Sequence, residues 1–172
     1  MQVVNHQKTH GFTLVEVIVA IGIISILLSI STISFNSWQI KHKMEAQIKE
    51  MASDFSEIRI RALTMKQRHS ITLNAQSYVF RSYSSESEDL FTGGTTIPGG
   101  SHTVVYKLKK GDGTDYAAEV YEIDQRGANV SSVATIYLEN GAASSGLNCL
   151  KLHTVRINPG NSTTIGGTCV DR

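Results

Sequence analysis

The sequence contains little of several residue types on which common protein classes depend. Its 172 residues include 2 cysteines, 2 prolines and 7% aromatic residues, and its 16 basic residues almost balance 15 acidic ones. The balanced charge gives no reason to expect a protein that binds polyanions through its net charge. Glycine is plentiful, with 14 residues. This composition is typical of a modest β-rich domain with many turns rather than of a large enzyme core.

No pattern typical of catalysis or cofactor binding occurs in the chain. The six histidines are scattered without an HxH or HExxH pattern, and no GxSxG pattern positions a nucleophilic serine. The stretch GDGTD offers Asp112 and Asp115, whose oxygens are of the kind that calcium prefers, but it lacks the remaining ligands of an EF-hand loop. We therefore predict a protein that is not an enzyme and that holds no cofactor and no metal.

The two cysteines, Cys149 and Cys169, lie in the last quarter of the chain. Neither belongs to a CxxC pair, and no histidine lies at metal-ligand spacing from them. In an exported domain they are expected to form a disulfide, which would stabilise the fold by about 3 kcal/mol. In a cytosolic protein they would instead be two buried thiols, so export of the C-terminal part decides between these alternatives.

One long apolar run extends from Phe12 to Phe35. Its 24 residues would form a helix about 36 Å long, enough to cross a hydrocarbon layer of about 30 Å. An ordinary secretory signal has a shorter apolar core, and a small residue follows that core at the cleavage site. Here the small residue, Gly11, precedes the run, so an ordinary signal fits poorly. The run predicts a transmembrane helix over 12–35.

The apolar run contains one charged residue, Glu16. A charge inside a bilayer is costly unless it has a partner, which argues against a plain membrane anchor, the simplest alternative. The run itself contains no cation. Cleavage after Gly11 would create one, because Phe12 would then carry a free α-amino group four residues before Glu16.

The residues GFTLVEV, which begin at Gly11, resemble the prepilin signature of type IV pilins and type II secretion pseudopilins. The resemblance implies that residues 1–11 are a leader peptide, which a prepilin peptidase and N-methyltransferase removes before it methylates Phe12. It also implies that Glu16 neutralises the N-terminal amine of a neighbouring subunit during filament assembly. Lysines on both sides of the run leave its orientation open. The resemblance implies a single pass through the bacterial inner membrane, with the head in the periplasm.

The apolar pattern continues beyond the run at helical spacing. Six apolar residues recur at intervals of four and three: Met44, Ile48, Met51, Phe55, Ile58 and Ala62. This spacing predicts one face of an amphipathic helix over 36–66, packed in the core of a soluble domain. Because no proline interrupts residues 12–65, one continuous helix is expected.

From Ser70 onward the pattern is typical of short strands joined by turns, and it predicts a β-rich head over 69–172. Residues 84–102 are rich in glycine and serine and are predicted to form a long loop. The stretches TVVYKLKK and YAAEVYEI flank GDGTD and predict a hairpin. The expected fold class is α+β, with a long N-terminal helix packed on a small head of two antiparallel sheets.

The chain as a whole resembles the GspH/FimT family of minor pilins and pseudopilins. The most informative part is YEIDQRGANVSSVATIYLEN, which is similar to that family's strand, turn and strand, with Gly127 at the turn. The resemblance implies a pilin-like fold and a low-abundance structural subunit at or near the filament tip. The filament would be a type II secretion pseudopilus or a type IV pilus, and its other pilin subunits would be the partners.

A DNA-binding function is the alternative, because FimT-like pilins of naturally competent bacteria bind DNA through a basic segment. Lys107, Lys109 and Lys110 form the only basic cluster of the predicted head. A few lysines give weak, salt-sensitive binding to phosphates at most. The C-terminal tail also lacks the arginine cluster associated with that group. We therefore favour a solvated edge strand over a DNA contact.

Overall fold

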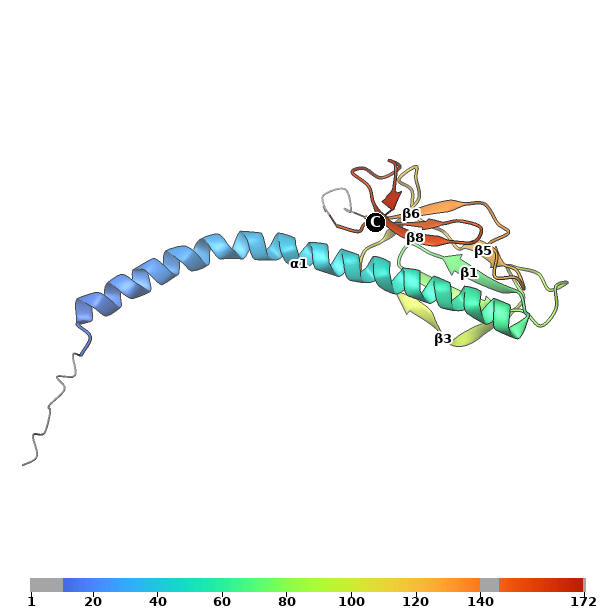
Figure 1. The fold of residues 1–172 in the computed structure, drawn as a ribbon, viewed down its shortest axis with the longest axis horizontal. Coiled ribbons are helices and arrows are strands. Elements are labelled where there is room, and N and C mark those ends of the chain that lie inside the picture. Colours follow the sequence, from blue (N-terminus) through green and yellow to red (C-terminus); the bar gives the residue numbers. More distant parts are fainter. Residues whose placement is uncertain (1–10, 140–145, 172) are drawn as a thin grey trace, which may run out of the picture. The chain divides into compact units, whose positions relative to one another are not determined.

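The computed structural model describes residues 11–139 and 146–171, with the backbone alone described for residues 30–34. The described chain forms one long helix, α1 (Leu14–Met65), followed by nine β-strands (Figure 1). This is the α+β class that the sequence predicts. The chain divides into two units between Gln39 and Ile40. The leader peptide predicted over 1–11 lies, except for Gly11, outside the described residues.

The first unit contains the beginning of α1, where the apolar side chains are exposed. Every described side chain from Gly11 to Ser29 is exposed. The predicted membrane span, 12–35, includes residues 30–34, whose side chains lie outside the described part of the chain. Across the residues that the structure describes, no helix has an apolar stretch of the length that a membrane crossing requires.

The second unit begins with the remainder of α1, whose apolar stripe forms the centre of the core. All six residues of the predicted stripe are at most 3% exposed: Met44, Ile48, Met51, Phe55, Ile58 and Ala62. Charged side chains lie off the stripe, where Glu57 and Arg61 form a salt bridge of 2.8 Å one helical turn apart. The predicted amphipathic face is thus confirmed.

Nine strands of the described chain form two antiparallel sheets. One sheet has the order β3-β2-β1-β5 and consists of β1 (His69–Leu73), β2 (Ser77–Ser82), β3 (Thr95–Thr103) and β5 (Glu119–Ile123). The other has the order β4-β6-β7-β8-β9 and consists of β4 (Leu108–Lys109), β6 (Ala134–Leu138), β7 (Cys149–Leu152), β8 (Ile157–Asn161) and β9 (Val170–Asp171). The predicted head of two antiparallel sheets is confirmed.

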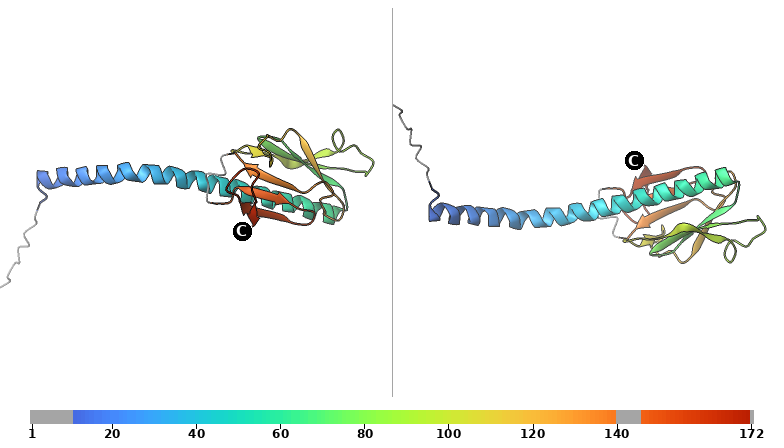
Figure 2. Two further views of the ribbon diagram at one scale, coloured as in Figure 1. Left: turned by 90° about the horizontal axis from the view of Figure 1, so that it is seen from above. Right: turned by 90° about the horizontal axis from the view of Figure 1, so that it is seen from below.

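A single core joins both sheets to the second part of α1, which runs alongside them in Figure 2. Phe55 of the helix packs edge-on against Tyr78 and Phe80 of β2, with ring centroids 5.4 Å and 5.9 Å away. The same cluster includes Ile136 of β6 and Leu150 of β7. Because the apolar stripe contacts both sheets at once, burial of its side chains holds the two sheets together.

Two polar contacts fix the helix within the second unit. The buried Gln47 side chain donates a hydrogen bond of 2.8 Å to the Tyr106 carbonyl and accepts one of 2.9 Å from the Tyr106 amide. Arg59 donates a hydrogen bond of 2.7 Å to the Gly127 carbonyl. A Cβ at position 127 would lie 2.9 Å from Cγ of Leu63, and φ there is +68°, so only glycine fits this turn without strain.

The predicted loop over 84–102 is wrong in its second half, where β3 (Thr95–Thr103) forms. The sequence favours a loop there because Pro98 and two adjacent glycines interrupt the strand pattern. The structure accommodates them because β3 is an edge strand, where a missing amide donor is tolerated. Its register with β2 also shifts between Val79 and Arg81.

The predicted hairpin around GDGTD is correct in its turn and wrong in its strands. Lys110 donates its amide hydrogen to the carbonyl of Thr114 at 2.9 Å, which closes the turn. However, β4 pairs with β6 and β5 pairs with β1, so the flanking strands belong to different sheets. The turn at Gly127 likewise connects β5 and β6, which lie in separate sheets. The turn residues determine where the chain reverses. Packing in the core determines which strands then pair with each other.

Candidate functional site

The first turn of α1 follows directly from its sequence. Gly11, Phe12 and Thr13 have no regular structure, and the helix begins at Leu14. The Thr13 hydroxyl oxygen accepts a hydrogen bond of 3.3 Å from the Glu16 amide, and the Thr13 carbonyl accepts one of 3.2 Å from Val17. Thr13 is therefore the N-cap, and Thr-Leu-Val-Glu matches the sequence of a capping box.

Glu16 occupies the third helical position and is exposed. Acidic side chains are favoured there, because the unpaired amides of the first turn carry partial positive charge. The Thr-x-x-Glu spacing at residues 13–16 is the sequence signal that indicates this helix start. Among the described residues, no lysine, arginine or histidine lies at salt-bridge distance from the Glu16 carboxylate.

Gly11, at the predicted cleavage site, is not required by the fold. A Cβ built on Gly11 would meet no atom within 4 Å, and its φ lies outside the left-handed region that favours glycine. Phe12, which follows it, is 83% exposed. A glycine that the fold does not require, next to an exposed residue, is compatible with recognition of this site by a processing enzyme. Cleavage after Gly11 and methylation of Phe12 nevertheless remain predictions.

From Val17 to Ser29 the helix presents apolar side chains on all sides. The large exposed ones beyond Glu16 include Val17, Ile18, Val19, Ile21, Ile23, Ile24, Ile26, Leu27 and Leu28. Ser25 and Ser29 donate their hydroxyl hydrogens to carbonyls four residues earlier, each at 2.8 Å. These serines therefore bring no unsatisfied donor into an apolar environment. Glu16 is the single charge in this part of the helix.

Cys149 and Cys169 form a disulfide, with their Cα atoms 6.1 Å apart. Cys149 belongs to β7, and Cys169 immediately precedes β9. Both are buried in a small cluster with Tyr137 and Ile165, separate from the main core. The bridge predicted for an exported domain is therefore present, and it ties the C-terminal segment to the five-stranded sheet.

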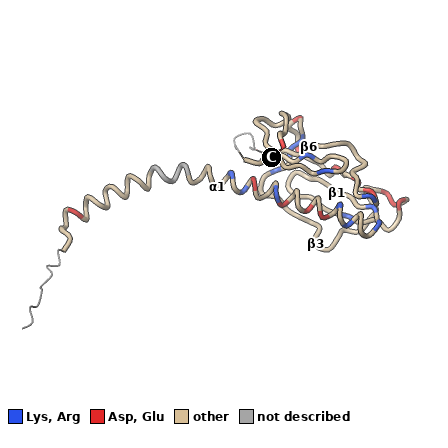
Figure 3. Tube along the Cα trace, in the orientation of Figure 1, with Lys and Arg blue, Asp and Glu red and all other residues tan. Residues whose placement is uncertain are grey.

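The lysine cluster of the alternative function is largely neutralised by acidic neighbours. Lys109 pairs with Asp115 at 2.6 Å, and Lys110 pairs with Glu119. A hydrogen bond to the partner carboxylate raises the pKa of each lysine. Within the described residues only Lys107 of the three has no carboxylate at salt-bridge distance. Figure 3 accordingly shows basic and acidic positions interspersed over the second unit.

The stretch GDGTD, considered for calcium, uses its first carboxylate to close the turn. Asp112 accepts hydrogen bonds from the Thr114 amide at 2.9 Å and from its hydroxyl at 2.6 Å. These bonds lower the pKa of Asp112. Asp115 is held by Lys109 instead. Asp112 thus stabilises the turn and Asp115 forms a salt bridge, which agrees with the interpretation of this stretch as a turn.

Comparison with known proteins gives one finding, and it concerns the start of α1. Residues 6–32 match the family model described as the prokaryotic N-terminal methylation motif. No curated protein and no solved structure is significantly similar to the chain. The motif is typical of structural, non-enzymatic precursors that assemble with other pilin subunits after processing by a prepilin peptidase. Gly11, Phe12 and Glu16 lie within it, so this segment indicates a precursor of the type IV pilin or pseudopilin type.

Proposed function

We propose that this protein is a minor pilin or pseudopilin, a structural subunit of a type II secretion pseudopilus or a type IV pilus. It is cut after Gly11, methylated at Phe12 and incorporated through the first part of α1. The observation that carries the proposal is the methylation motif over 6–32. Within that motif, Glu16 lies in the first turn of α1 and is the one charge of a largely apolar stretch, Leu14 to Ser29, whose side chains are exposed.

The exposed apolar surface at the start of α1 must be removed from water. A helix that is apolar all round is stable only in lipid or among other apolar helices. We infer that the inner membrane covers it before assembly and that neighbouring subunits cover it within the filament. The head then lies in the periplasm. The disulfide between Cys149 and Cys169 supports this location, because disulfides form and persist in oxidising compartments.

Glu16 gives specificity to the packing between the α1 helices of neighbouring subunits, which would otherwise be entirely apolar. Removal of the leader gives Phe12 a positive α-amino group at the start of the same segment. In a low-dielectric environment, an opposite charge at close range offsets the cost of burying a carboxylate. A neighbouring subunit that places its amine against Glu16 satisfies both charges. This pairing fixes the axial offset between subunits, which apolar contacts alone leave loosely defined.

The position at or near the tip, in filament initiation and in support of protein secretion, rests on the resemblance to the GspH/FimT family. A charge-balanced head suits this role better than DNA capture, because Lys109 and Lys110 are paired with carboxylates. Deletion of the gene, with secretion, twitching motility and transformation scored side by side, tests it. We expect a loss of secretion or of twitching motility. A loss of transformation alone would support the DNA-binding alternative.

Mass spectrometry of the chain purified from its host tests the processing step. We expect the polypeptide to start at an N-methylated Phe12. Cells that lack prepilin peptidase are the control, and in them the chain should retain Met1. A chain that starts at Met1 in cells with an active peptidase would contradict the proposal.

A further inference from the structure

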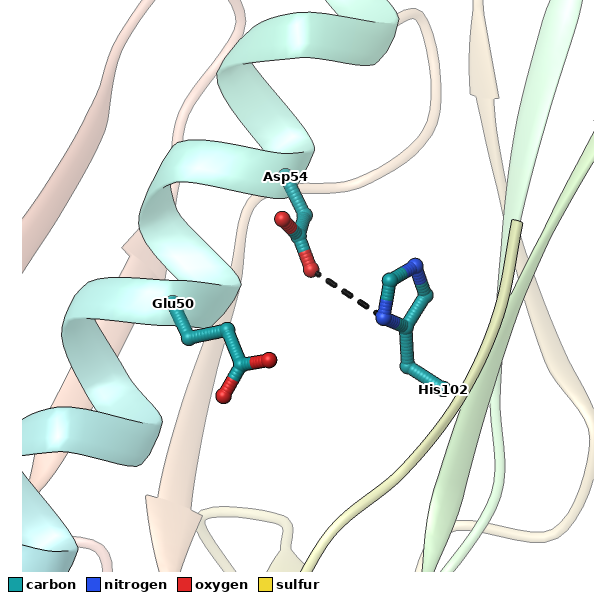
Figure 4. Close-up of side chains that lie close together, drawn as sticks. All are labelled: Glu50, Asp54 and His102. Carbon is teal, nitrogen blue, oxygen red and sulfur yellow. Dashed lines mark ion pairs between the residues drawn. The ribbon is translucent and has the colours of Figure 1, made fainter. Parts of the chain in front are cut away.

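A cluster of metal-ligand side chains lies in the second unit and takes no part in the proposed function. Glu50 and Asp54 belong to α1, and His102 belongs to β3. One ligand atom of each residue lies within 4.8 Å of the other two. Figure 4 shows the three side chains converging on one small region between the helix and the strand.

The cluster follows from helix periodicity and strand register. Glu50 and Asp54 are four residues apart, which places both carboxylates on one helix face, one turn apart. His102 is paired with Tyr78 in the register of β2 and β3, so the two side chains lie on the same sheet face. Their rings stack with centroids 4.9 Å apart and planes 9° apart. This stacking fixes the orientation of the imidazole.

Tyr78 also orients Asp54. Its hydroxyl donates a hydrogen bond of 2.5 Å to Oδ2 of Asp54. Burial is the largest cause that raises the pKa of Tyr78, and the hydrogen bond to Asp54 raises it further. The hydroxyl therefore keeps its proton and remains a donor. One buried tyrosine therefore holds both Asp54 and His102. Outer-shell contacts of this kind accompany most metal-binding side chains, because they hold the ligands in position.

The distance between Asp54 and His102 fits a shared ion better than a hydrogen bond. Oδ2 of Asp54 and Nδ1 of His102 are 3.5 Å apart, whereas a hydrogen bond between such atoms is about 2.7–3.2 Å long. Zinc ligands bind at about 2.0–2.2 Å, so two ligand atoms of one tetrahedral ion lie about 3.4 Å apart. Glu50 is exposed, so its side chain is free to rotate and complete the third bond.

The local charge also favours a cation. Two carboxylates four residues apart on a helix repel each other. Among the described residues, no lysine or arginine lies at salt-bridge distance from Glu50 or Asp54, and His102 is the one basic group beside Asp54. A cavity of about 90 Å³ adjoins Asp54 and His102, and its lining also includes Glu57 and Arg61, which pair with each other, but not Glu50. This volume accommodates a water molecule beside Asp54 and His102.

We propose that Glu50, Asp54 and His102 bind a divalent transition-metal ion, with Zn²⁺ as the favoured species. An imidazole with carboxylates suits zinc, whereas calcium prefers ligands that are all oxygen. Three protein ligands leave the fourth position to water. The bound ion joins α1 to the edge strand β3 and so braces the open edge of the four-stranded sheet.

Isothermal titration of the full chain in detergent with Zn²⁺ tests the site, with His102→Gln and Glu50→Gln as the variants. We expect each variant to weaken binding by about tenfold or more, since each removes one ligand. Glu57→Gln is the matched control, because Glu57 is an exposed carboxylate of the same helix that lines the cavity and pairs with Arg61. This control should bind Zn²⁺ like the wild type.

Two further measurements keep the result unambiguous. Zn²⁺ at about one hundred times its Kd should raise the midpoint of thermal unfolding by about 5–10 °C in the wild type and not in Glu50→Gln. Because Glu50 is exposed, this variant keeps its core, which circular dichroism verifies. Absence of Zn²⁺ binding in the wild type, or equal binding by the wild type and both variants, overturns the proposal. Ca²⁺ that binds more tightly than Zn²⁺ overturns the choice of ion.

Discussion

Helix α1 contains two regions that differ in how their apolar side chains are covered. In residues 40–65 six apolar residues form one stripe that both sheets of the head bury, whereas apolar residues off the stripe, such as Ile60, are exposed. In the region up to Ser29 the apolar residues occur all round, and all are exposed. Ile48 is 0% exposed and Ile24 is 54% exposed, although both are isoleucines in the same helix.

The contrast shows that the pattern of apolar residues predicts the kind of partner a helix requires. A stripe that repeats at intervals of three and four covers one side only, so a folded domain on that side satisfies it. Apolar residues on every side require apolar surroundings on every side. The first region therefore depends on lipid or other subunits, whereas the second depends on its own chain.

Replacement of Glu16 by alanine tests the first region and has the largest expected effect. We expect insertion and leader cleavage to continue, while incorporation into filaments falls by about tenfold or more, because the partner amine is left unpaired in an apolar environment. Immunoblots of sheared filaments, compared with those of whole cells, measure the incorporated fraction.

Thr13→Ala is the matched control for Glu16→Ala, since it removes the side-chain cap and keeps the carboxylate. It should lower helix stability by only about 1 kcal/mol and leave most of the incorporation intact. Incorporation of Glu16→Ala at the wild-type level would refute the pairing role.

Phe55→Ala and Leu27→Ala compare the two regions directly. Phe55 is fully buried against Tyr78 and Phe80, so its truncation should lower the free energy of unfolding of the head by about 3–5 kcal/mol. Leu27 is 62% exposed, so its truncation should leave that free energy unchanged. Urea unfolding of the full chain in detergent measures both free energies when it is monitored by the near-UV circular dichroism of the tyrosines. A similar loss in both variants would remove the distinction between the regions.

Loss of the disulfide should affect the head, which packs on the second region, and leave the first region unchanged. The bridge joins residues separated by 20 positions, so replacing both cysteines by serine should lower the free energy of unfolding of the head by about 3 kcal/mol. The helicity of the first region should not change. Parallel measurements of urea unfolding and far-UV circular dichroism check this. A loss of helicity in the first region on removal of the disulfide would contradict this expectation.

Gly127→Ala has the smallest of the expected effects, about 2 kcal/mol of destabilisation of the head. The added methyl group meets Leu63 and the Arg59 carbonyl at about 3 Å, in a backbone conformation that L-residues rarely adopt. Gly113→Ala is the control, because φ is also positive there but a Cβ meets nothing within 4 Å. It should cost about half as much, and equal losses in urea unfolding would show that the contact with α1 is unimportant.

The sequence predicts those features that depend on neighbouring residues along the chain. The stripe from Met44 to Ala62 is confirmed because helix periodicity alone determines which side chains share a face. The grouping of Gly11, Phe12 and Glu16 is likewise local, and the methylation motif over 6–32 includes all three. The capping by Thr13 is equally local, because the Thr-x-x-Glu spacing alone indicates it.

Features that depend on distant residues were not predictable in the same way. Whether β4 pairs with β5 or with β6 depends on how both sheets pack on the helix, and no local pattern records that choice. Pro98 indicates a loop unless the strand lies at an edge, which again depends on its neighbours. His102 lies beside Asp54 because the register of β2 and β3 places it against Tyr78, whose hydroxyl donates a hydrogen bond to Asp54.

The paired hydrogen bonds between Gln47 and Tyr106 have a mechanical consequence. An apolar stripe repeats with every turn, so a helix held by it alone could slide by about 5.4 Å and find similar packing. Sliding would separate the buried amide from both backbone groups and leave all of them without partners. The pair therefore fixes the axial position of this part of α1 in the head. A force along or about the helix axis is thus transmitted to the head without sliding of the helix.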